Sequence, residues 1–439
     1  RPQLAAAMTA SGDGGAPPGA KAMASTAPLA ADRAAARPIP DATWSAHVAD
    51  AGVITTELNR LWAQVGRIED RGRIDGDGVP SLGIQTRAST LNLTTVARSR
   101  LEAARVEEAV MSLSELYPSR ATILVADPER PEAHRGLDVK LVLLEQPASK
   151  GRPAVRFECV IVEASAANER QLASIASPLL VVDLPDFLWW ASDSILGSML
   201  FEDLCAISDR IIVDTAAAPQ AAAELRALAA LPAHGDNAPR LSDFAWARVA
   251  TWRAMTTQFF DTPSGRASLD ALDRIEIDYG LPEADRRSGF TTALLVVGWL
   301  ASRLGWSPPG AMVPTRGVPN AWHLTFRAGP PFAPREIVVD LRPSPAAFAG
   351  LALGRVALLA GGGALARYEI ERISDMEVRS TSQVENGPEA TRTVFDLPEG
   401  ESGLLADELR IFNRDTTYEA ALAVASVIAP VGPRFGNAG

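Results

Sequence analysis

Residues 90–126 read TLNLTTVARSRLEAARVEEAVMSLSELYPSRATILVA, and the order of patterns within them sets the fold class. Residues 90–96 alternate apolar and polar side chains as a half-buried strand does, and residues 100–117 carry apolar side chains at helical spacing. Residues 121–126 form a continuous apolar run, which is typical of a strand buried on both faces. A strand, a helix and a second strand in this order predict two parallel strands connected by a helix.

The same alternation extends to both sides of this stretch and predicts one α/β domain over residues 41–262 with a mainly parallel sheet. An amphipathic helix around residues 53–65 opens this domain, and residues 220–262 close it as an aromatic-rich helical segment. Further strands are expected at residues 139–144, 155–163 and 210–214, with helices near residues 168–177 and 200–207.

Residues 263–439 show a different order and predict an α+β domain with a largely antiparallel sheet. One long apolar helix is expected over residues 291–304, and a final helix from about residue 401. Between them, short turns join the strands expected at residues 322–327, 336–341, 356–359, 366–373 and 393–397. Strands connected without intervening helices favour antiparallel pairing.

Residues 1–40 are rich in Ala, Pro and Gly and lack any spacing that would bury a face. We expect this segment to be disordered. A transit peptide is the alternative, because such peptides also contain Arg and Ser and are poor in acidic residues. Cytoplasmic location is the expectation for the chain, and a plastid is the alternative if residues 1–40 are such a peptide.

Composition excludes several classes of function. The chain of 439 residues has 42 Lys and Arg against 53 Asp and Glu, a net charge of −11, which does not suit binding to the phosphates of nucleic acid. The longest uncharged stretch near residues 288–302 has 15 residues, fewer than the roughly 18 to 20 that span a bilayer. We therefore expect neither a nucleic-acid partner nor a membrane partner.

Motifs for metals, cofactors and catalysis are weak. Two cysteines and no C-x-x-C exclude a disulfide framework and disfavour structural zinc, and no H-E-x-x-H or G-x-S-x-G occurs. Residues 361–366 (GGGALA) fit the dinucleotide-binding pattern G-x-G-x-x-A, but the sequence after them is rich in β-formers. A glycine-rich hairpin turn is the favoured interpretation, and we expect no cofactor and no metal.

Cys159 and Cys205 are candidates for a redox-sensing thiol. Cys159 lies in phase with apolar residues of an expected strand, and Cys205 follows a leucine of an expected helix. This pattern favours buried thiols, whereas sensing needs exposure and a lowered pKa.

Three carboxylates near an aromatic segment offer an alternative function. Asp183, Asp186 and Asp193 could supply the acid and the base of a sugar- or sugar-phosphate-acting enzyme, with aromatic rings as the stacking platform. The structural alternative is that Asp183 and Asp186 bracket a turn at Pro185 while Asp193 caps the next helix.

Aromatic residues are the most unusual feature of the chain. They gather in a segment after Pro185 and in a second segment over residues 244–260, which also contains two arginines. Trp and Arg are common at interface hot spots, but most large aromatic residues lie in cores. The candidates for partner binding, or for the core that supports it, are Phe187, Trp189, Trp190, Trp246, Arg248, Trp252 and Arg253.

Read in order, these segments resemble the glucose-6-phosphate dehydrogenase assembly protein family, OpcA, of cyanobacteria and actinobacteria. The resemblance covers about residues 45–430. Its most specific parts are L-P-x-F-L-W-W at residues 184–190 and D-x-x-W-x-R-x-x-x-W-R at residues 243–253. Supporting segments are TLNLTTV at 90–96, YPSRA at 117–121, PLLVVD at 178–183 and DRIIVD at 209–214.

The resemblance implies a non-enzymatic partner that binds glucose-6-phosphate dehydrogenase and activates it allosterically. It thereby implies a role in NADPH supply through the oxidative pentose phosphate pathway. No redox cysteine of the family maps onto Cys159 or Cys205.

Overall fold

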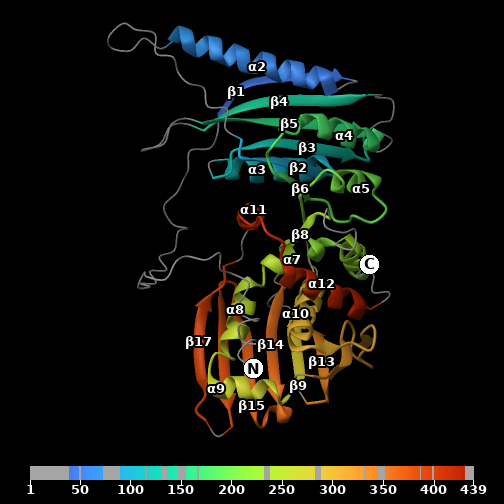
Figure 1. The fold of residues 1–439 in the computed structure, drawn as a ribbon, viewed down its shortest axis with the longest axis vertical. Helices are drawn as coiled ribbons and strands as arrows, with labels where there is room; N and C mark the ends of the chain where they lie inside the picture. Colours follow the sequence, from blue (N-terminus) through green and yellow to red (C-terminus); the bar gives the residue numbers. More distant parts are fainter. Residues whose placement is uncertain are drawn as a thin grey trace, which may run out of the picture. The chain divides into compact units, whose positions relative to one another are not determined.

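The computed structural model describes residues 39–48, 51–72, 89–114, 116–130, 136–146, 155–165, 168–231, 238–281, 288–330, 333–344, 352–385, 387–397 and 400–430. Of the residues 1–40 expected to be disordered, residues 1–38 lie outside these ranges, whereas residues 39 and 40 begin a strand. The chain divides into two compact units, residues 10–186 and residues 187–439 (Figure 1). The domain limits expected from the sequence, 41–262 and 263–439, remain a proposal.

The first unit is built on five strands in the order β1-β4-β5-β3-β2. The pairs β2–β3 and β3–β5 are parallel, whereas β4 is antiparallel to both β1 and β5. The strands are β1 (Ile39–Val48), β2 (Leu91–Ala97), β3 (Ser119–Asp127), β4 (Leu137–Gln146) and β5 (Val155–Ser165), and the helices are α2 (Ala51–Gly72), α3 (Arg100–Leu113) and α4 (Glu169–Ala176).

The strand–helix–strand unit expected at residues 90–126 is confirmed as β2, α3 and β3. Every residue of β2 is buried, including the polar Asn92, Thr94 and Thr95, although its alternating pattern predicted a half-buried strand. Ser99 starts α3, because its hydroxyl accepts the backbone N–H of Glu102 at 3.1 Å. Strand β1 was missed by the sequence prediction, although residues 42–48 alternate Ala, Trp, Ala and Val with Thr, Ser and His as a half-buried strand does.

The second unit begins with three parallel strands, β6 (Asp186–Trp190), β7 (Arg210–Val213) and β8 (Arg240–Asp243). Helices α5 (Met199–Cys205) and α6 (Ala221–Ala230) connect them. The sequence predicted a helical segment over residues 220–262. This prediction is wrong in part, because β8 interrupts the segment. The four residues of β8, RLSD, are too few to show a strand period.

The rest of the second unit holds a nine-stranded sheet in the order β10-β12-β13-β9-β14-β15-β16-β17, with β11 beside β12. Apart from the parallel pair β13–β9, the pairs are antiparallel, which confirms the predicted fold class. The strands are β9 (Leu272–Tyr279), β10 (Trp306–Ser307), β11 (Val313–Pro314), β12 (Trp322–Ala328), β13 (Arg335–Pro343), β14 (Leu353–Ala360), β15 (Ala366–Ser374), β16 (Glu377–Val384) and β17 (Ala390–Phe395).

The glycines of residues 361–366 form the hairpin turn expected from the sequence. Strands β14 and β15 pair antiparallel on either side of it, and Gly361, Gly362 and Gly363 have φ values of 58°, 64° and 93°. These left-handed conformations explain the choice of glycine. The predicted final helix is two helices, α11 (Glu401–Glu408) and α12 (Thr416–Ile428), and the hydroxyl-rich strand β16 was not predicted.

Helix α10 (Gly289–Leu304) is the core of the second unit, as its apolar sequence predicts. It packs against α12 so closely that a Cβ atom at Gly298 would lie 2.2 Å from the carbonyl oxygen of Ala421. None of the helices within the described ranges is long and apolar enough to cross a membrane.

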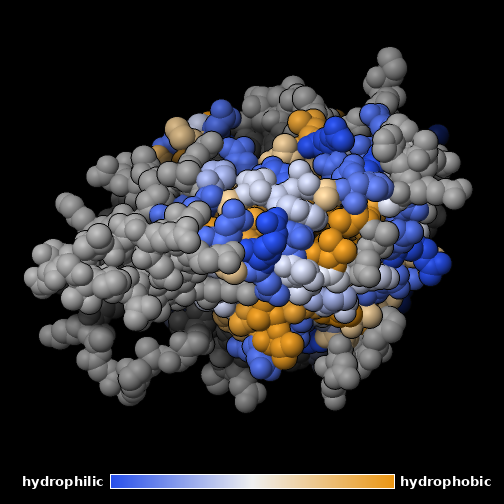
Figure 2. All heavy atoms as spheres, turned by 90° about the horizontal axis from the view of Figure 1, so that it is seen from above, coloured by the Kyte–Doolittle hydropathy of each residue, from blue (hydrophilic) through white to orange (hydrophobic). Residues whose placement is uncertain are grey.

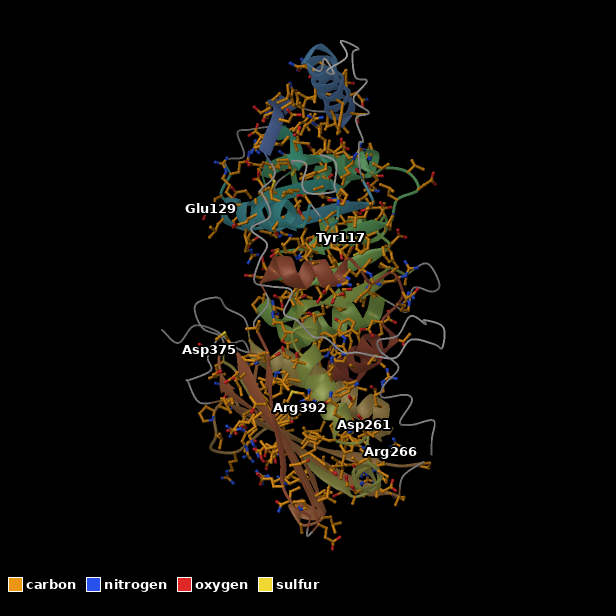
Figure 3. All side chains as sticks on the ribbon, turned by 90° about the vertical axis from the view of Figure 1, so that its left-hand side faces the viewer. Tyr117, Glu129, Asp261, Arg266, Asp375 and Arg392 are labelled. Carbon is orange, nitrogen blue, oxygen red and sulfur yellow. The ribbon has the colours of Figure 1, made fainter. Side chains whose placement is uncertain are left out.

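Helices α7 (Phe244–Ala247), α8 (Ala250–Gln258) and α9 (Pro263–Leu269) carry the chain from β8 to β9. The turn between α8 and α9 is held by Arg266, whose guanidinium donates to the carbonyl oxygens of Phe260 at 3.2 Å and Asp261 at 3.1 Å. The side chains of Asp261 and Arg266 are labelled in Figure 3. Figure 2 shows hydrophobic residues in separate groups among hydrophilic ones on the face it draws. Scattered apolar residues of this kind are ordinary on a protein surface.

Candidate functional site

The ends of β7 and β8 carry the best candidate for a functional site in the second unit. Asp214 follows β7 directly, and Asp243 is the last residue of β8. Because the two strands are parallel neighbours, their carboxyl ends share one edge of the sheet. Ligands of open α/β sheets bind at this edge, so the chemistry of these two carboxylates decides whether a ligand site exists.

Asp243 is completely buried and surrounded by donors. Its carboxylate accepts the backbone N–H of Thr215 at 3.1 Å, the Thr215 hydroxyl at 2.6 Å, the N–H of Ala245 at 2.9 Å and the Tyr418 hydroxyl at 3.1 Å. Burial raises the pKa of Asp243 to about 6, although the hydrogen bonds from Thr215 oppose this rise. The side chain therefore caps α7 and fastens α12 to the sheet.

Asp214 is paired with Arg248 in a two-pronged ion pair. The two guanidinium nitrogens Nη1 and Nη2 each lie 2.7 Å from a carboxylate oxygen, and the side chains are 19% and 12% exposed. Burial lowers the pKa of Arg248, but the nearby carboxylate of Asp214 outweighs this effect and the net shift is upward. Fork-like pairing of this kind gives both strength and a fixed orientation.

Trp246 joins the same network from α7. Its indole N–H donates to Asp415 Oδ2 at 3.0 Å, and its ring lies 3.6 Å from the guanidinium carbon of Arg253. The ring centroids of Trp246 and Tyr418 are 5.9 Å apart. Burial lowers the pKa of Arg253 to about 10, and the ring face offers this cation a favourable electrostatic partner.

Trp252 connects α8 to the nine-stranded sheet. Its indole N–H donates to Asp396 Oδ2 at 3.1 Å, and the same carboxylate pairs with Arg372 of β15. The guanidinium carbon of Arg372 lies 5.7 Å from the Trp252 ring centroid. Both tryptophans of the second aromatic segment thus use their N–H groups to bind carboxylates that lie far along the chain.

A buried arginine and a buried glutamate complete the cluster. Arg210, which is 1% exposed, donates to Ser242 Oγ at 2.7 Å and to the carbonyl oxygen of Asn413 at 2.5 Å. Glu408 of α11 is 6% exposed, and burial raises its pKa to about 7 against the attraction of Arg210. Helices α7, α11 and α12 therefore occupy the edge where a ligand would bind, and the carboxylates there are bound to the protein itself.

The first aromatic segment also lies in the interior. Phe187, Trp189 and Trp190 are 3%, 1% and 1% exposed. Trp190 donates to the carbonyl oxygen of Ser194 at 3.0 Å and contacts Phe201 edge to face at 5.2 Å between ring centroids. Side chains buried to this degree cannot touch a partner directly.

The three aspartates of the alternative enzyme hypothesis lie in a turn, at the start of β6 and in the loop after β6. Asp183 lies in a turn with a left-handed φ of 68°, and Asp186 accepts a hydrogen bond from Asn92 Nδ2 at 2.7 Å. The same Asn92 side chain binds both the N–H and the carbonyl oxygen of Val181, each at 2.9 Å. Asp193 lies in the loop after β6, and the interpretation that it caps the next helix is wrong, because Ser198 caps α5. This arrangement agrees with the turn interpretation of Asp183 and Asp186.

Both cysteines are free thiols in buried positions. Cys159 is 1% exposed and Cys205 is 8% exposed. Burial raises the pKa of each thiol to about 12, with Glu107 adding to the effect at Cys159 and Glu202 at Cys205. The thiolate, which is the reactive form, is therefore strongly disfavoured in the folded chain.

We expect neither thiol to react while the chain is folded. Titration with a chromogenic disulfide reagent near pH 8 should detect less than about one tenth of an equivalent in the native protein, because reaction needs an exposed thiolate. Two equivalents should appear after unfolding in guanidinium chloride, which serves as the control. Fast reaction of one full equivalent in the native state would contradict the burial argument.

Metal chemistry finds no support in the described part of the chain, where no group of three or more His, Cys, Asp or Glu could hold a metal ion.

The carboxylates at the strand ends were not singled out by sequence reasoning. One signal could have found them, namely an aspartate placed directly after each of the strands at residues 210–213 and 240–243.

Two domain families match the chain. Residues 110–230 match the glucose-6-phosphate dehydrogenase subunit N-terminal domain, and residues 239–422 match the C-terminal domain of the same subunit. The OxPP cycle protein OpcA of Nostoc punctiforme is 34% identical over 151 residues, which are 34% of this chain and 30% of that protein. The OpcA protein of Synechococcus elongatus is 28% identical over 285 residues, 64% of this chain and 61% of that protein.

The matches thus span less than two thirds of the length of these relatives. Among solved structures, yvaA of Bacillus subtilis, described as an oxidoreductase, is 10% identical with a TM-score of 0.43. That alignment covers 76% of this chain and 94% of the other. Similarity this low supports no conclusion about activity.

Proposed function

Because the chain belongs to the glucose-6-phosphate dehydrogenase assembly family OpcA, we propose that it is a non-catalytic protein that binds this dehydrogenase and favours its active conformation. The observation that carries the proposal is the match of both domain families, over residues 110–230 and 239–422. In this role the chain supports the oxidative pentose phosphate pathway and its supply of NADPH.

The buried polar cluster agrees with a role that needs no active site. The edge of β7 and β8, where an α/β protein would hold its ligand, is filled by Trp246 and Tyr418 from the chain itself. Asp214 and Asp243 are satisfied by Arg248, Thr215 and Tyr418. Carboxylates saturated in this way are not available to bind substrate or to transfer a proton.

Activation requires that the chain bind one conformation of the enzyme more tightly than another. A difference in binding free energy of about 1 to 3 kcal/mol shifts the equilibrium roughly 5- to 150-fold. A rigid binding surface serves this purpose, because a preorganised partner loses little entropy on binding. We propose that Trp246, Trp252 and the two arginines beside them supply this rigidity from within the second unit.

Mixing the chain with its cognate dehydrogenase tests the proposal. We expect co-elution of the two proteins and a changed dependence of the dehydrogenase rate on glucose 6-phosphate. The chain alone should turn over none of a panel of glycosides and sugar phosphates. Unchanged kinetics together with separate elution would refute the proposal, and turnover by the chain alone that is lost in Asp186→Asn would support the enzyme alternative.

A further inference from the structure

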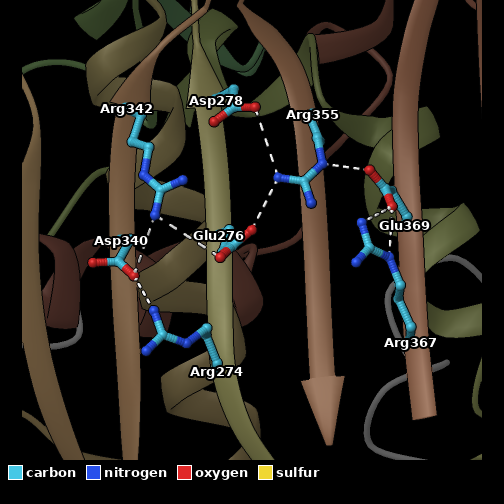
Figure 4. Close-up of polar contacts among 8 residues, drawn as sticks. All are labelled: Arg274, Glu276, Asp278, Asp340, Arg342, Arg355, Arg367 and Glu369. Carbon is cyan, nitrogen blue, oxygen red and sulfur yellow. Dashed lines mark hydrogen bonds and ion pairs between the residues drawn. The ribbon is translucent and has the colours of Figure 1, made fainter. Parts of the chain in front are cut away.

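One face of the nine-stranded sheet is covered with paired charges. Helix-facing positions of this sheet carry apolar and aromatic residues such as Tyr279, which contacts Phe290 of α10 at 5.3 Å between ring centroids. Alternation along each strand places the other set of side chains on the opposite face. Figure 4 shows eight of these side chains, which are Arg274, Glu276, Asp278, Asp340, Arg342, Arg355, Arg367 and Glu369.

Strand register arranges these side chains in rows that run across the strands. An acidic row contains Asp340 of β13, Glu276 of β9 and Glu369 of β15. Asp340 pairs with Glu276, and Ala357 of β14 pairs with both Glu276 and Glu369. Two residues further along the strands, a basic row contains Arg274 and Arg367, in register through Leu359. On the other side of the acidic row, a mixed row alternates in sign across five strands in the order Arg342, Asp278, Arg355, Glu371, Arg379.

The rows are held in place by ion pairs within the sheet. Arg274 lies 2.5 Å from Asp340, and Arg367 lies 2.7 Å from Glu369. Arg355 bridges Glu276 at 3.1 Å and Glu369. The carboxylate side chains are 16–19% exposed in the acidic row, whereas Arg274 and Arg367 are 40% and 48% exposed. Guanidinium groups with several donors thus stand oriented above the sheet.

This pattern is complementary to itself. Consider a two-fold axis that lies in the plane of the face, runs parallel to the rows and passes between the acidic row and the basic row. Rotation about this axis places the acidic row of each copy over the basic row of the other copy. Glu276 then faces Arg274, and Glu369 faces Arg367. Further along the same rows, Thr381 of one copy faces Gln383 of the other. Symmetric dimers use one surface in this reciprocal way.

The net charge and the area of this face both suit a second copy of the chain. The three rows hold five arginines and five carboxylates, so their sum is 5 − 5 = 0 on a chain of net charge −11. Two copies therefore meet here without the repulsion that other faces impose. Six strands about 4.8 Å apart and about eight residues long give a face of roughly 700 Å², close to the ~800 Å² that each partner buries in a typical stable interface.

We propose that this face, from β12 to β16, is the surface through which two copies of the chain form a symmetric dimer. The two sheets pack face to face, about 10 Å apart as in other sheet-on-sheet packings. Rows of opposite charge fix the register of the two copies. The proposal concerns the chain alone and does not depend on its function.

Sedimentation equilibrium of the full chain tests the dimer. We expect a dimer at low salt whose dissociation constant rises at least tenfold when NaCl is raised from about 50 mM to about 500 mM, because salt screens the facing rows. Arg367→Glu should weaken the dimer at least tenfold. Arg410→Glu carries the same charge change at a site just after α11 that is 70% exposed, and it should leave the dimer unchanged.

A charge swap separates a direct contact from a structural effect. Arg367→Glu alone sets Glu against Glu369 of the second copy, and Glu369→Arg alone sets Arg against Arg367. In an equal mixture of the two variants each contact becomes one of opposite sign, so dimers should return. Circular dichroism shows whether each variant is folded, and the salt series on the wild-type chain stands if one is not.

Several outcomes would overturn the proposal. A wild-type chain that stays monomeric to about 200 µM at low salt rules out the dimer, since its facing charges are then at their strongest. A dimer that Arg367→Glu leaves intact excludes this face. A monomeric wild-type chain that loses co-elution with the dehydrogenase in Arg367→Glu but not in Arg410→Glu assigns the face to the enzyme instead.

Discussion

Replacing Arg248 with methionine is expected to lower the free energy of unfolding by about 3–5 kcal/mol. The substitution keeps a long apolar stem but leaves the carboxylate of Asp214, whose side chain is 12% exposed, without its two-pronged partner. A largely buried carboxylate that loses a two-pronged partner loses much of the compensation for its lost hydration. Urea unfolding of the full chain, followed by tryptophan fluorescence and circular dichroism, measures this loss.

Two further variants separate charge from packing. Arg410→Met removes an arginine that is 70% exposed and pairs only across one helical turn, so it should change the stability by less than about 0.5 kcal/mol. The double variant Arg248→Met/Asp214→Asn removes both charges and should recover a large part of the stability lost in the single variant. If Arg248→Met were as mild as Arg410→Met, the pair would not hold α7 to the strand ends.

Much of the fold can be predicted because burial imposes strong periods on the sequence. The buried strands β2 and β3 and the helix between them follow from residues 90–126, and the apolar α10 follows from residues 291–304. The four-residue β8 and the hydroxyl-rich β16 were missed because their apolar patterns are weak, and the edge strand β1 was missed although it alternates apolar and polar residues. In β8 and β16 pairing with neighbours, rather than a pattern of their own, determines the structure.

The candidate site could be predicted only in part, for a different reason. Sequence motifs select Trp246 and Trp252, but their partners Asp415 and Asp396 lie 169 and 144 residues away along the chain. No local pattern reveals hydrogen bonds of such separation. An indole ring at a core position and one at an interface obey the same spacing, so the sequence leaves both interpretations open. In the structure the side chains of Trp246 and Trp252 are 3% and 2% exposed, and their part in partner binding remains a proposal.

The free energy of unfolding is expected to fall as pH rises from about 5 to about 8. Glu408 is the main contributor to this fall whose effect a single variant can isolate. Burial raises the pKa of Glu408 from 4.5 to about 7, and Asp415 and Asp243 add to this rise while Ser242 and Arg210 oppose it. Because the folded chain holds this proton more tightly than the unfolded chain, the stabilisation is complete below pH 4.5 and is lost as pH rises through about 7. The loss from this group amounts to about 3 kcal/mol.

Glu408→Gln removes the titration and keeps the shape of the side chain. Between about pH 5 and pH 8, the free energy of unfolding should fall by about 2–3 kcal/mol less in the variant than in the wild-type chain, as measured by urea unfolding at each pH. Asp407→Asn is the matched control, because this neighbour on α11 is 59% exposed and should leave the wild-type pH dependence intact. Groups that do not interact with Glu408 act equally in both chains and cancel in the comparison, whereas Asp243, with its pKa of about 6, is coupled to Glu408 and contributes to the difference. Equal pH dependence of the wild-type chain and Glu408→Gln would mean that Glu408 stays ionised beside Arg210, and that α11 is fastened to β7 and β8 by a permanent ion pair.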